Sequence, residues 1–335
     1  MKFRNYKLRI TNYELQSVDS LLRKTIFFFL VSLLFASFSF SQIGGSAGSF
    51  ARMGFGARGM GMGNALSAAT TGEAATYYNP AVSPFVEGRT ISATSSFLSL
   101  DRRLNFLNYT QSVAPTAGFS LGIINQSVSE IDGRDADGIH TKNYSTTENQ
   151  FYFSFANRLS RKISLGINAK LYYAKLFEKL SSTTVGFDAG VLIKPNDVLS
   201  FAAVIQDFNS KYRWNTKDLY QENGGETVDT FPTLYKFGAQ YFIPSARSIV
   251  SLEIETSGKN KLLMRGGIEI TLNEYFTLRS GIDRYDLEDE FVGVKPTFGF
   301  SVQPLSDLKT FVHYAYIFEP FSPRDAHILS VSFSF

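Results

Sequence analysis

The sequence contains no cysteine. This absence excludes disulfide bonds, thiolate metal sites and the acylated cysteine of a lipoprotein. Long apolar runs are also missing beyond the first 41 residues, whereas a transmembrane helix needs about 18 or more consecutive apolar residues. Histidine is rare, and His140, His313 and His327 lie in no pattern that predicts a metal site or a serine–histidine pair. We therefore expect no helical membrane domain, no metal or other cofactor, and no enzyme.

Charged residues make up only 19% of the chain and the formal net charge is +3, so the sequence predicts no nucleic-acid partner. Aromatic residues are abundant by contrast, with 32 phenylalanines and 17 tyrosines. Hydrophobic residues reach 44%, yet the mean hydropathy stays near zero. This combination is typical of a transmembrane β-barrel, which hides its apolar residues in alternation and carries aromatic girdles at the membrane interfaces.

The N-terminal segment has the pattern of a secretory signal peptide. Arg23 and Lys24 supply a basic region, residues 25–35 form a short apolar core, and residues 39–41 are a small-x-small cleavage site. The core is too short for a comfortable transmembrane span, so a membrane anchor is the less favoured alternative. We interpret the first 41 residues as a signal peptide, whose long polar beginning indicates a start site assigned too far upstream.

From residue 90 onward, apolar and polar residues alternate in successive segments, as they do in half-exposed strands. In the last segment, Leu329, Val331, Phe333 and Phe335 alternate with serines. We expect fourteen strands in all, an even number as in bacterial single-chain barrels. Their predicted ranges are 90–99, 104–112, 116–127, 150–159, 162–176, 184–194, 198–208, 233–243, 247–256, 261–271, 275–283, 296–303, 308–319 and 326–335.

The connections between these strands support a closed barrel. Every second connection is tight, whereas three of the others are long: 128–149, 209–232 and 284–295. Short periplasmic turns that alternate with longer extracellular loops are the pattern of outer-membrane barrels. The predicted fold class is therefore all-β: a 14-stranded antiparallel transmembrane β-barrel with both termini on the periplasmic side. We expect it in the cell outer membrane, in contact with outer-membrane lipid.

The chain ends on an amphipathic strand with two aromatic residues, Phe333 and Phe335. This ending resembles the signal that the barrel assembly machinery recognises, which predicts that machinery as a partner. An ordinary last strand is the alternative.

Residues 42–89 precede the first strand, are rich in glycine, alanine and methionine, and show little alternation. A fourteen-stranded barrel is too wide for its wall side chains alone to fill. We therefore expect this segment to form an N-terminal plug or hatch at the periplasmic mouth of the barrel, which comprises residues 90–335. Within the plug we expect a short helix around Asn64 to Ala69.

Charged residues are predicted on the inward faces of three neighbouring strands. The hairpin register can place Glu253 opposite Arg265, Arg265 opposite Asp283, and Glu269 opposite Arg279. One interpretation is a polar lumen wall that guides solutes or seats the plug. The other, which we favour, is that a polar barrel interior simply requires paired charges.

Two short motifs point to other functions but lack their structural context. Residues 54–59 fit the dinucleotide pattern G-x-G-x-x-G, but no strand precedes them and no βαβ unit surrounds them. Asp132, Asp135 and Asp137 suggest a calcium loop, but the twelfth position of an EF-hand would be Tyr144 rather than glutamate. A solvated loop is the better interpretation of these acidic residues, with weak calcium binding as the alternative.

Two segments of the plug resemble a known family. Residues 52–65, RMGFGARGMGMGNA, contain Gly61 and Gly63 and are similar to the GARAMGMGGA opening of PorV/PorQ-type proteins, which are relatives of the FadL outer-membrane transporters. Residues 74–81, AATYYNPA, resemble the A-x-Y-x-NPA signature of that family, with Val82 where a glycine is usual.

Residues 186–197 and 214–232 resemble further segments of the family, so the resemblance covers roughly residues 50–335. It implies a fourteen-stranded FadL-like barrel with an N-terminal segment inside. FadL relatives pass hydrophobic compounds through a lateral opening. PorV-type proteins belong to the type IX secretion system of Bacteroidota, where they receive secreted proteins that carry a conserved C-terminal domain.

Three hypotheses follow. We favour a component of the type IX secretion system. Tyr212 and Trp214 are then candidate extracellular loop contacts for the C-terminal domains of its cargo, although for these two residues we favour a structural role as interface aromatics. The alternative is a transporter of hydrophobic small molecules, which would bind such a ligand and open a hatch around Asn79, Pro80 and Ala81. Pro80 is then a hinge or an anchor of the hatch; the alternative is a rigid turn that closes the plug. The third is a structural barrel without a dedicated substrate.

Overall fold

The computed structural model describes residues 46–257, 261–286, 293–304 and 309–335. The predicted signal peptide lies outside these residues. No helix in the described part of the chain is both long enough and apolar enough to cross a membrane.

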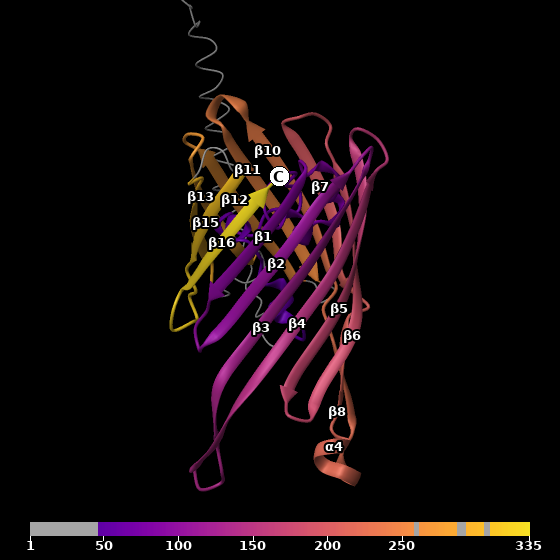
Figure 1. Ribbon diagram of the computed structural model, residues 1–335, viewed down its shortest axis with the longest axis vertical. Coiled ribbons are helices and arrows are strands. Elements are labelled where there is room, and N and C mark those ends of the chain that lie inside the picture. Colours follow the sequence, from indigo (N-terminus) through magenta and orange to yellow (C-terminus); the bar gives the residue numbers. More distant parts are fainter. Residues whose placement is uncertain (1–45, 258–260, 287–292, 305–308) are drawn as a thin grey trace, which may run out of the picture.

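Fourteen antiparallel strands of the described chain close into a barrel, in which the first strand pairs with the last (Figure 1). The predicted fold class is therefore confirmed. The barrel strands are β1 (Arg89–Phe97), β2 (Arg102–Val113), β3 (Ala117–Arg134), β4 (His140–Arg158), β5 (Ile163–Phe177), β6 (Leu180–Ile193), β7 (Leu199–Phe208), β10 (Leu234–Ile243), β11 (Ser248–Ser257), β12 (Lys261–Thr271), β13 (Phe276–Asp286), β14 (Lys295–Val302), β15 (Lys309–Ile317) and β16 (Ala326–Ser334).

Two of the expected long loops contain regular structure. The range 128–149 is the outer part of the long β3–β4 hairpin. The range 209–232 holds a separate two-stranded ribbon of β8 (Lys211–Asn215) and β9 (Glu226–Thr230), joined by α4 (Lys217–Tyr220) and η3 (Gln221–Asn223). Many side chains in both segments are exposed. Water meets both faces of the outer β3–β4 hairpin, so little apolar alternation marks these residues in the sequence. β8 differs, because one of its faces is buried.

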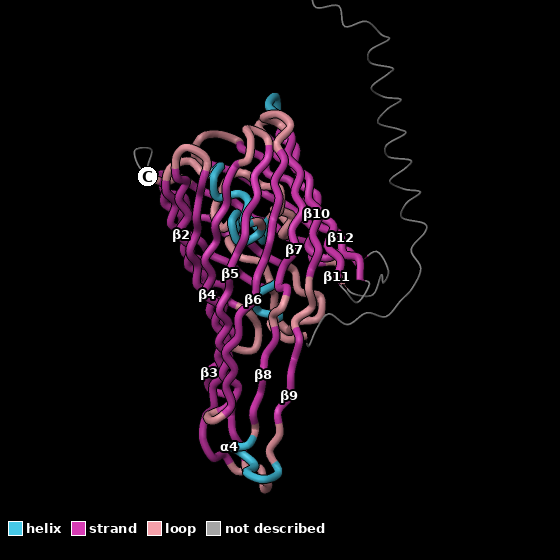
Figure 2. Tube along the Cα trace, turned by 90° about the vertical axis from the view of Figure 1, so that its right-hand side faces the viewer, coloured by secondary structure: helices cyan, strands magenta, loops and turns pink. Residues whose placement is uncertain are grey.

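Both projections lie at the same end of the barrel, here called the long-loop end (Figures 1 and 2). Tight connections, including η4 (Pro244–Ala246), lie at the opposite short-turn end, where the C-terminus also lies (Figure 1). Backbone hydrogen bonds join Arg89 and Phe335 there, which ties the start of β1 to the end of the chain.

The barrel wall is apolar outside and largely polar inside. On β4, Phe151, Phe153 and Phe155 are 44–49% exposed on the outer face, whereas Gln150 and Ser154, on the inner face, are fully buried. The same alternation of exposed and buried residues runs through the other barrel strands. An apolar outer band with a polar interior is the surface of a barrel that spans a membrane.

The described segment before β1 lies inside the barrel (Figure 2). We call residues 46–88 the plug; its short helices are η1 (Ser49–Arg52), α2 (Ala57–Gly61), α3 (Ala75–Tyr78) and η2 (Pro80–Phe85). The sequence predicts a plug at one mouth of the barrel. In the structure the plug extends further, because Ser49, Arg52, Met53 and Met60 line a cavity at the long-loop end. Most of its residues are buried, so it forms much of the barrel's core.

The helix expected around Asn64 to Ala69 is absent, and a helix forms one turn earlier, at Ala57–Gly61. Gly63 and Asn64 have φ angles of 62° and 60°, in the left-handed region. Glycine enters this region at no steric cost, and asparagine tolerates it better than most residues. These two residues therefore end the helix before the segment in which we predicted it.

Candidate functional site

The plug rests on a ring of wall glycines that face the barrel interior. We call these the glycine belt: Gly118, Gly166, Gly190, Gly238, Gly267 and Gly281, on β3, β5, β6, β10, β12 and β13. A Cβ added at Gly166 would lie 2.4 Å from the backbone nitrogen of Ala81, and one at Gly267 would lie 2.3 Å from the carbonyl oxygen of Met62. Only glycine allows the plug backbone to approach the wall this closely.

The predicted hatch residues Asn79, Pro80 and Ala81 lie at the start of η2 and are fully buried or nearly so. The Asn79 side-chain amide donates to the carbonyl oxygens of Ser67, at 2.9 Å, and Val191, at 3.2 Å. Its Oδ1 accepts from the Ala81 backbone nitrogen at 2.9 Å. One side chain thus fastens two parts of the plug to each other and to β6, a geometry that fits an anchor in a rigid turn better than a free hinge.

Gly61 and Gly63, the other predicted plug residues, lie against β12–β14. The hydroxyl of Thr297 on β14 donates to the Gly61 carbonyl oxygen and accepts from the Gly63 backbone nitrogen, both at 3.1 Å. A Cβ added at Gly63 would lie 2.4 Å from the carbonyl oxygen of Ile282. Both glycines therefore sit where the plug backbone meets the wall.

The five charged residues predicted on the lumen wall lie together and are buried. Glu253 lies opposite Arg265, and Glu269 opposite Arg279, in the strand register. Arg265 also reaches Asp283 across a β-bulge, with 2.8 Å between Nε and Oδ1. The same arginine contacts Glu255 at 2.8 Å.

Two of these carboxylates also bind the plug. The side-chain amide of Asn64 donates to Asp283 at 3.0 Å, and the backbone nitrogen of Ser67 donates to Glu253 at 3.1 Å. These contacts support the interpretation that the wall charges seat the plug. The sequence alone favours the other interpretation, in which a polar interior simply requires paired charges.

Sequence reasoning missed the strongest link between plug and wall, which is made by Arg58 of α2. Its Nε and Nη2 donate to the two oxygens of Glu269 at 2.7 and 2.9 Å, a bidentate pair. Its backbone nitrogen donates to Glu73 of the plug at 3.0 Å, and Nε of Arg279 donates at 2.5 Å to Oε2 of Glu269, the oxygen that also accepts from Nε of Arg58. One signal in the sequence could have indicated this link: Arg52 and Arg58 are the only basic residues among residues 46–88.

A second buried charge cluster, also missed, lies on β5–β7, which β10 alone separates from β11–β13 in the barrel. Lys170 on β5 lies 2.8 Å from both Asp188 on β6 and Asp207 on β7. Tyr172 donates to Asp207 at 2.5 Å, and Arg52 of the plug lies 3.6 Å from the same carboxylate. Buried charges are costly unless they are paired, so each cluster constrains the plug next to it.

Aromatic rings of the plug, the barrel wall and the segment of residues 209–232 form one buried cluster inside the barrel. We call them the aromatic column: Phe50, Phe55, Tyr77, Tyr78, Phe106, Tyr152, Tyr172, Tyr212, Trp214 and Phe231. Ring centroids are 5.1 Å apart for Trp214 and Tyr212, 4.8 Å for Tyr212 and Phe231, and 4.9 Å for Phe231 and Tyr172. Phe50 continues this line into the plug, 6.5 Å from Tyr172. These spacings are those of attractive aromatic pairs.

The expectation that Tyr212 and Trp214 are exposed loop contacts is wrong. Both lie on one face of β8, and they are only 2% and 7% exposed. The Tyr212 hydroxyl donates to Glu148 at 3.1 Å, and the Trp214 indole nitrogen donates to Asp229 at 2.7 Å. Because the base of the ribbon packs over the lumen, this face of β8 is covered rather than exposed.

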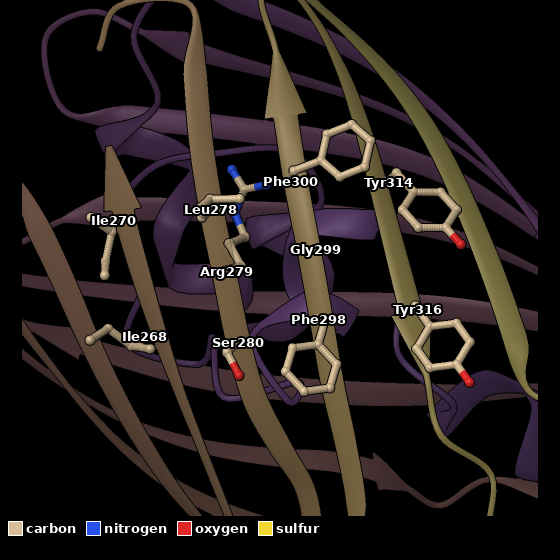
Figure 3. Close-up of a pocket in the computed structure, with 10 residues that line it drawn as sticks. All are labelled: Ile268, Ile270, Leu278, Arg279, Ser280, Phe298, Gly299, Phe300, Tyr314 and Tyr316. Carbon is tan, nitrogen blue, oxygen red and sulfur yellow. The ribbon is translucent and has the colours of Figure 1, made fainter. Parts of the chain in front are cut away.

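The outer wall carries a groove of about 400 Å³ over β12–β15. Figure 3 shows four aromatic rings, from Phe298, Phe300, Tyr314 and Tyr316, around the small residue Gly299. The plug lies directly behind this point, because a Cβ added at Gly61 would be 3.4 Å from the Cα of Gly299. Here a single layer of backbone separates the plug from the membrane-facing surface.

The architecture is that of a plugged fourteen-stranded membrane barrel, and solved structures share it. The Pseudomonas putida toluene transporter TodX matches with a TM-score of 0.59 and 14% identity, over 83% of this chain and 96% of that one. The Ralstonia pickettii toluene transporter TbuX matches with a TM-score of 0.59 and 14% identity, over 84% and 98%. A Pseudomonas aeruginosa FadL homologue matches with a TM-score of 0.58 and 11% identity, over 83% and 97%. The fold is therefore FadL-like.

No protein-family model matches the chain, and no curated protein matches it. The FadL-like part of the sequence resemblance agrees with the fold, whereas the PorV/PorQ part receives no support from these comparisons. Phe333 and Phe335 are 47% and 63% exposed at the end of β16, and their role as an assembly signal stays a prediction.

Proposed function

We propose that this protein is an outer-membrane barrel that passes hydrophobic small molecules, with the plug as its gate. The observation that carries the proposal is the aromatic column inside a plugged barrel of FadL-like fold. A lumen filled with aromatic rings favours apolar solutes, because each ring offers a large apolar surface. The solved structures of similar fold include two toluene transporters, which supports the same class of solute.

The described structure is a closed state of such a transporter. The plug contacts the wall through the glycine belt and both charge clusters, so a solute that follows the column must displace part of it. The outer groove lies over Gly299, behind which the plug packs, and an apolar molecule that left the lumen sideways at this point would enter the groove and reach the membrane.

The test is uptake of radiolabelled toluene by cells that lack the gene and are complemented with variants. We expect Tyr212→Leu with Trp214→Leu to lower the uptake rate about two- to tenfold, since an aromatic pair is worth about 0.5–1.5 kcal/mol. Tyr235→Leu, on the outer wall, is the matched control and should leave uptake unchanged. If loss of the gene lowers the uptake of arabinose but not of toluene, the protein is a general pore and the proposal fails.

The secretion hypothesis is the second candidate, and one observation favours it. The β3–β4 hairpin and the ribbon project beyond the barrel (Figure 2) and expose apolar residues, including Ile139 and Tyr220 at 64% each. Periplasmic accumulation of proteins with C-terminal sorting domains in a strain lacking the gene would support this function. Unchanged export of those proteins would exclude it.

A further inference from the structure

The polar rings of the aromatic column all direct their hydrogen-bond donors at acceptors beside the column. The rings that carry an O–H or N–H group are those of Tyr77, Tyr78, Tyr152, Tyr172, Tyr212 and Trp214. Each of them donates within the described chain to a backbone carbonyl oxygen, a side-chain amide oxygen or a carboxylate. The column therefore offers apolar ring faces to a solute and has hydrogen-bond acceptors along its sides.

Three of these acceptors are carboxylates, and their burial increases along the column. The rings of Trp214, Tyr212 and Tyr172 follow one another toward the plug. Their partners, in the same order, are exposed, half-buried and fully buried: Asp229, Glu148 and Asp207. A buried acceptor that loses its donor is costly, so displacing a polar ring costs more the deeper that ring lies.

The innermost of these carboxylates, Asp207, has one oxygen to spare. Its Oδ1 accepts from Tyr172 and from Lys170, whereas its Oδ2 forms no hydrogen bond within the described part of the chain. Nη1 of Arg52 lies 3.6 Å from this Oδ2 and also forms no hydrogen bond among the described residues. The two side chains are 0% and 7% exposed. One acceptor and one donor are thus buried side by side without satisfying each other.

Aromatic rings surround this pair of polar atoms. The Arg52 guanidinium lies over the ring of Phe231, 5.9 Å from its centroid. The Tyr172 ring packs against both Phe231 and Phe50, and its hydroxyl donates to Asp207. We call these five residues the inner subsite. It combines apolar ring faces with one spare donor and one spare acceptor.

We propose that the inner subsite binds aromatic solutes that carry a hydroxyl group, in preference to aromatic hydrocarbons. The solute ring packs against the rings of the subsite, and its hydroxyl donates to Oδ2 of Asp207 and accepts from Nη1 of Arg52. A hydrocarbon makes the ring contacts but leaves both buried atoms without a hydrogen bond, which disfavours its binding. A solute that displaces Tyr172 can also replace the lost hydrogen bond only if it carries a donor. The inference rests on the proposed function and narrows it to hydroxylated aromatic solutes.

The chain has a single tryptophan, Trp214, so tryptophan fluorescence reports binding in the column. The full chain in phosphatidylcholine vesicles would be titrated with para-butylphenol, para-butylanisole and butylbenzene, with excitation at the red edge of the tryptophan absorption, where phenols absorb little. Vesicles without protein correct for partition into lipid. The anisole keeps the ring and the oxygen but has no O–H. We expect the phenol to bind at least about tenfold more tightly than either other probe, since tenfold corresponds to about 1.4 kcal/mol, the scale of one hydrogen bond.

Two variants test the two polar atoms separately. Arg52→Met removes the donor and Asp207→Asn removes the charge of the acceptor, so each should reduce the advantage of the phenol to about threefold or less. Arg213→Met, on the exposed face of β8 between Tyr212 and Trp214, is the matched control and should keep the full advantage. If Asp207→Asn loses the folded band of the unheated protein on gels, the result for Arg52→Met decides.

Each other outcome overturns the inference. Equal binding of the three probes would show that the column accepts any apolar ring. Equal binding of the phenol and the anisole would show that the solute does not donate to Asp207. An undiminished advantage in both variants would place the hydroxyl elsewhere, and unchanged fluorescence with every probe would show that no such solute enters the column. Toluene uptake by cells with the wild-type gene tests the proposed function separately, because it can persist after any of these results.

Discussion

The two sides of the plug are held against the barrel by different interactions. Toward β3 and β5, here called the glycine side, the plug backbone of η2 lies directly on Gly118 and Gly166 of the belt. Toward β12 and β13, here called the charged side, the plug backbone also lies on belt glycines, but Arg58 adds a bidentate ion pair with Glu269. Backbone against backbone cannot rearrange without moving the wall, whereas an ion pair can exchange partners. Because the charged side relies partly on this ion pair, it is the one we expect to open first.

The largest effect is expected on the glycine side. Gly166→Val would place side-chain atoms inside the backbone of Pro80 and Ala81, since even a Cβ would lie 2.4 Å from both. Overpacking of a core costs about 1–3 kcal/mol where neighbouring side chains can move, but here the obstacle is backbone, so we expect a cost above the about 3–5 kcal/mol of a broken buried ion pair. We expect the variant to lose the folded band of the unheated protein on denaturing gels. Gly225→Ala, where a Cβ meets no atom within 4 Å, is the control and should keep that band.

The charged side should tolerate change better but still respond strongly. Arg58→Met leaves Glu269 with only one of its two arginines and removes the bidentate pair. Removing one partner of a buried ion pair costs about 3–5 kcal/mol, which would be measured as the shift in denaturant unfolding. Lys142→Met, which breaks an exposed pair with Glu178, is the control and should produce no measurable shift. A variant as stable as the wild type would show that the Arg58 contact does not hold the plug.

The smallest effect is expected at Asn79, whose side chain joins the two sides. Asn79→Ala removes its hydrogen bonds to Ser67 and Val191, and a buried group left without its partner costs about 1–3 kcal/mol. The chain has no cysteine of its own, so Ser83→Cys and Ser67→Cys can report opening by their rates of maleimide labelling. We expect Asn79→Ala to speed labelling at position 67 more than at position 83. Faster labelling at position 83 would reverse the comparison and make the glycine side the gate.

The plug shows why its contacts were harder to predict than the strands. A strand reveals itself by alternation over neighbouring residues, as in Leu329 to Phe335, and each such pattern is local. Arg58 and Glu269 are 211 residues apart in the chain, and no spacing rule connects them. The plug motifs were visible as unusual composition, but the residues that they contact were not.

The sequence by itself determined the alternating strands, their number, and the rhythm of tight and long connections, because the membrane outside and the polar interior impose a period of two on every wall strand. It also placed Glu253 opposite Arg265, since hairpin register follows from the turn between two strands. Only the tertiary structure decided that the ribbon covers Tyr212 and Trp214 and that wall glycines seat the plug. These features depend on segments far apart in the chain, which meet only when the barrel closes around the plug.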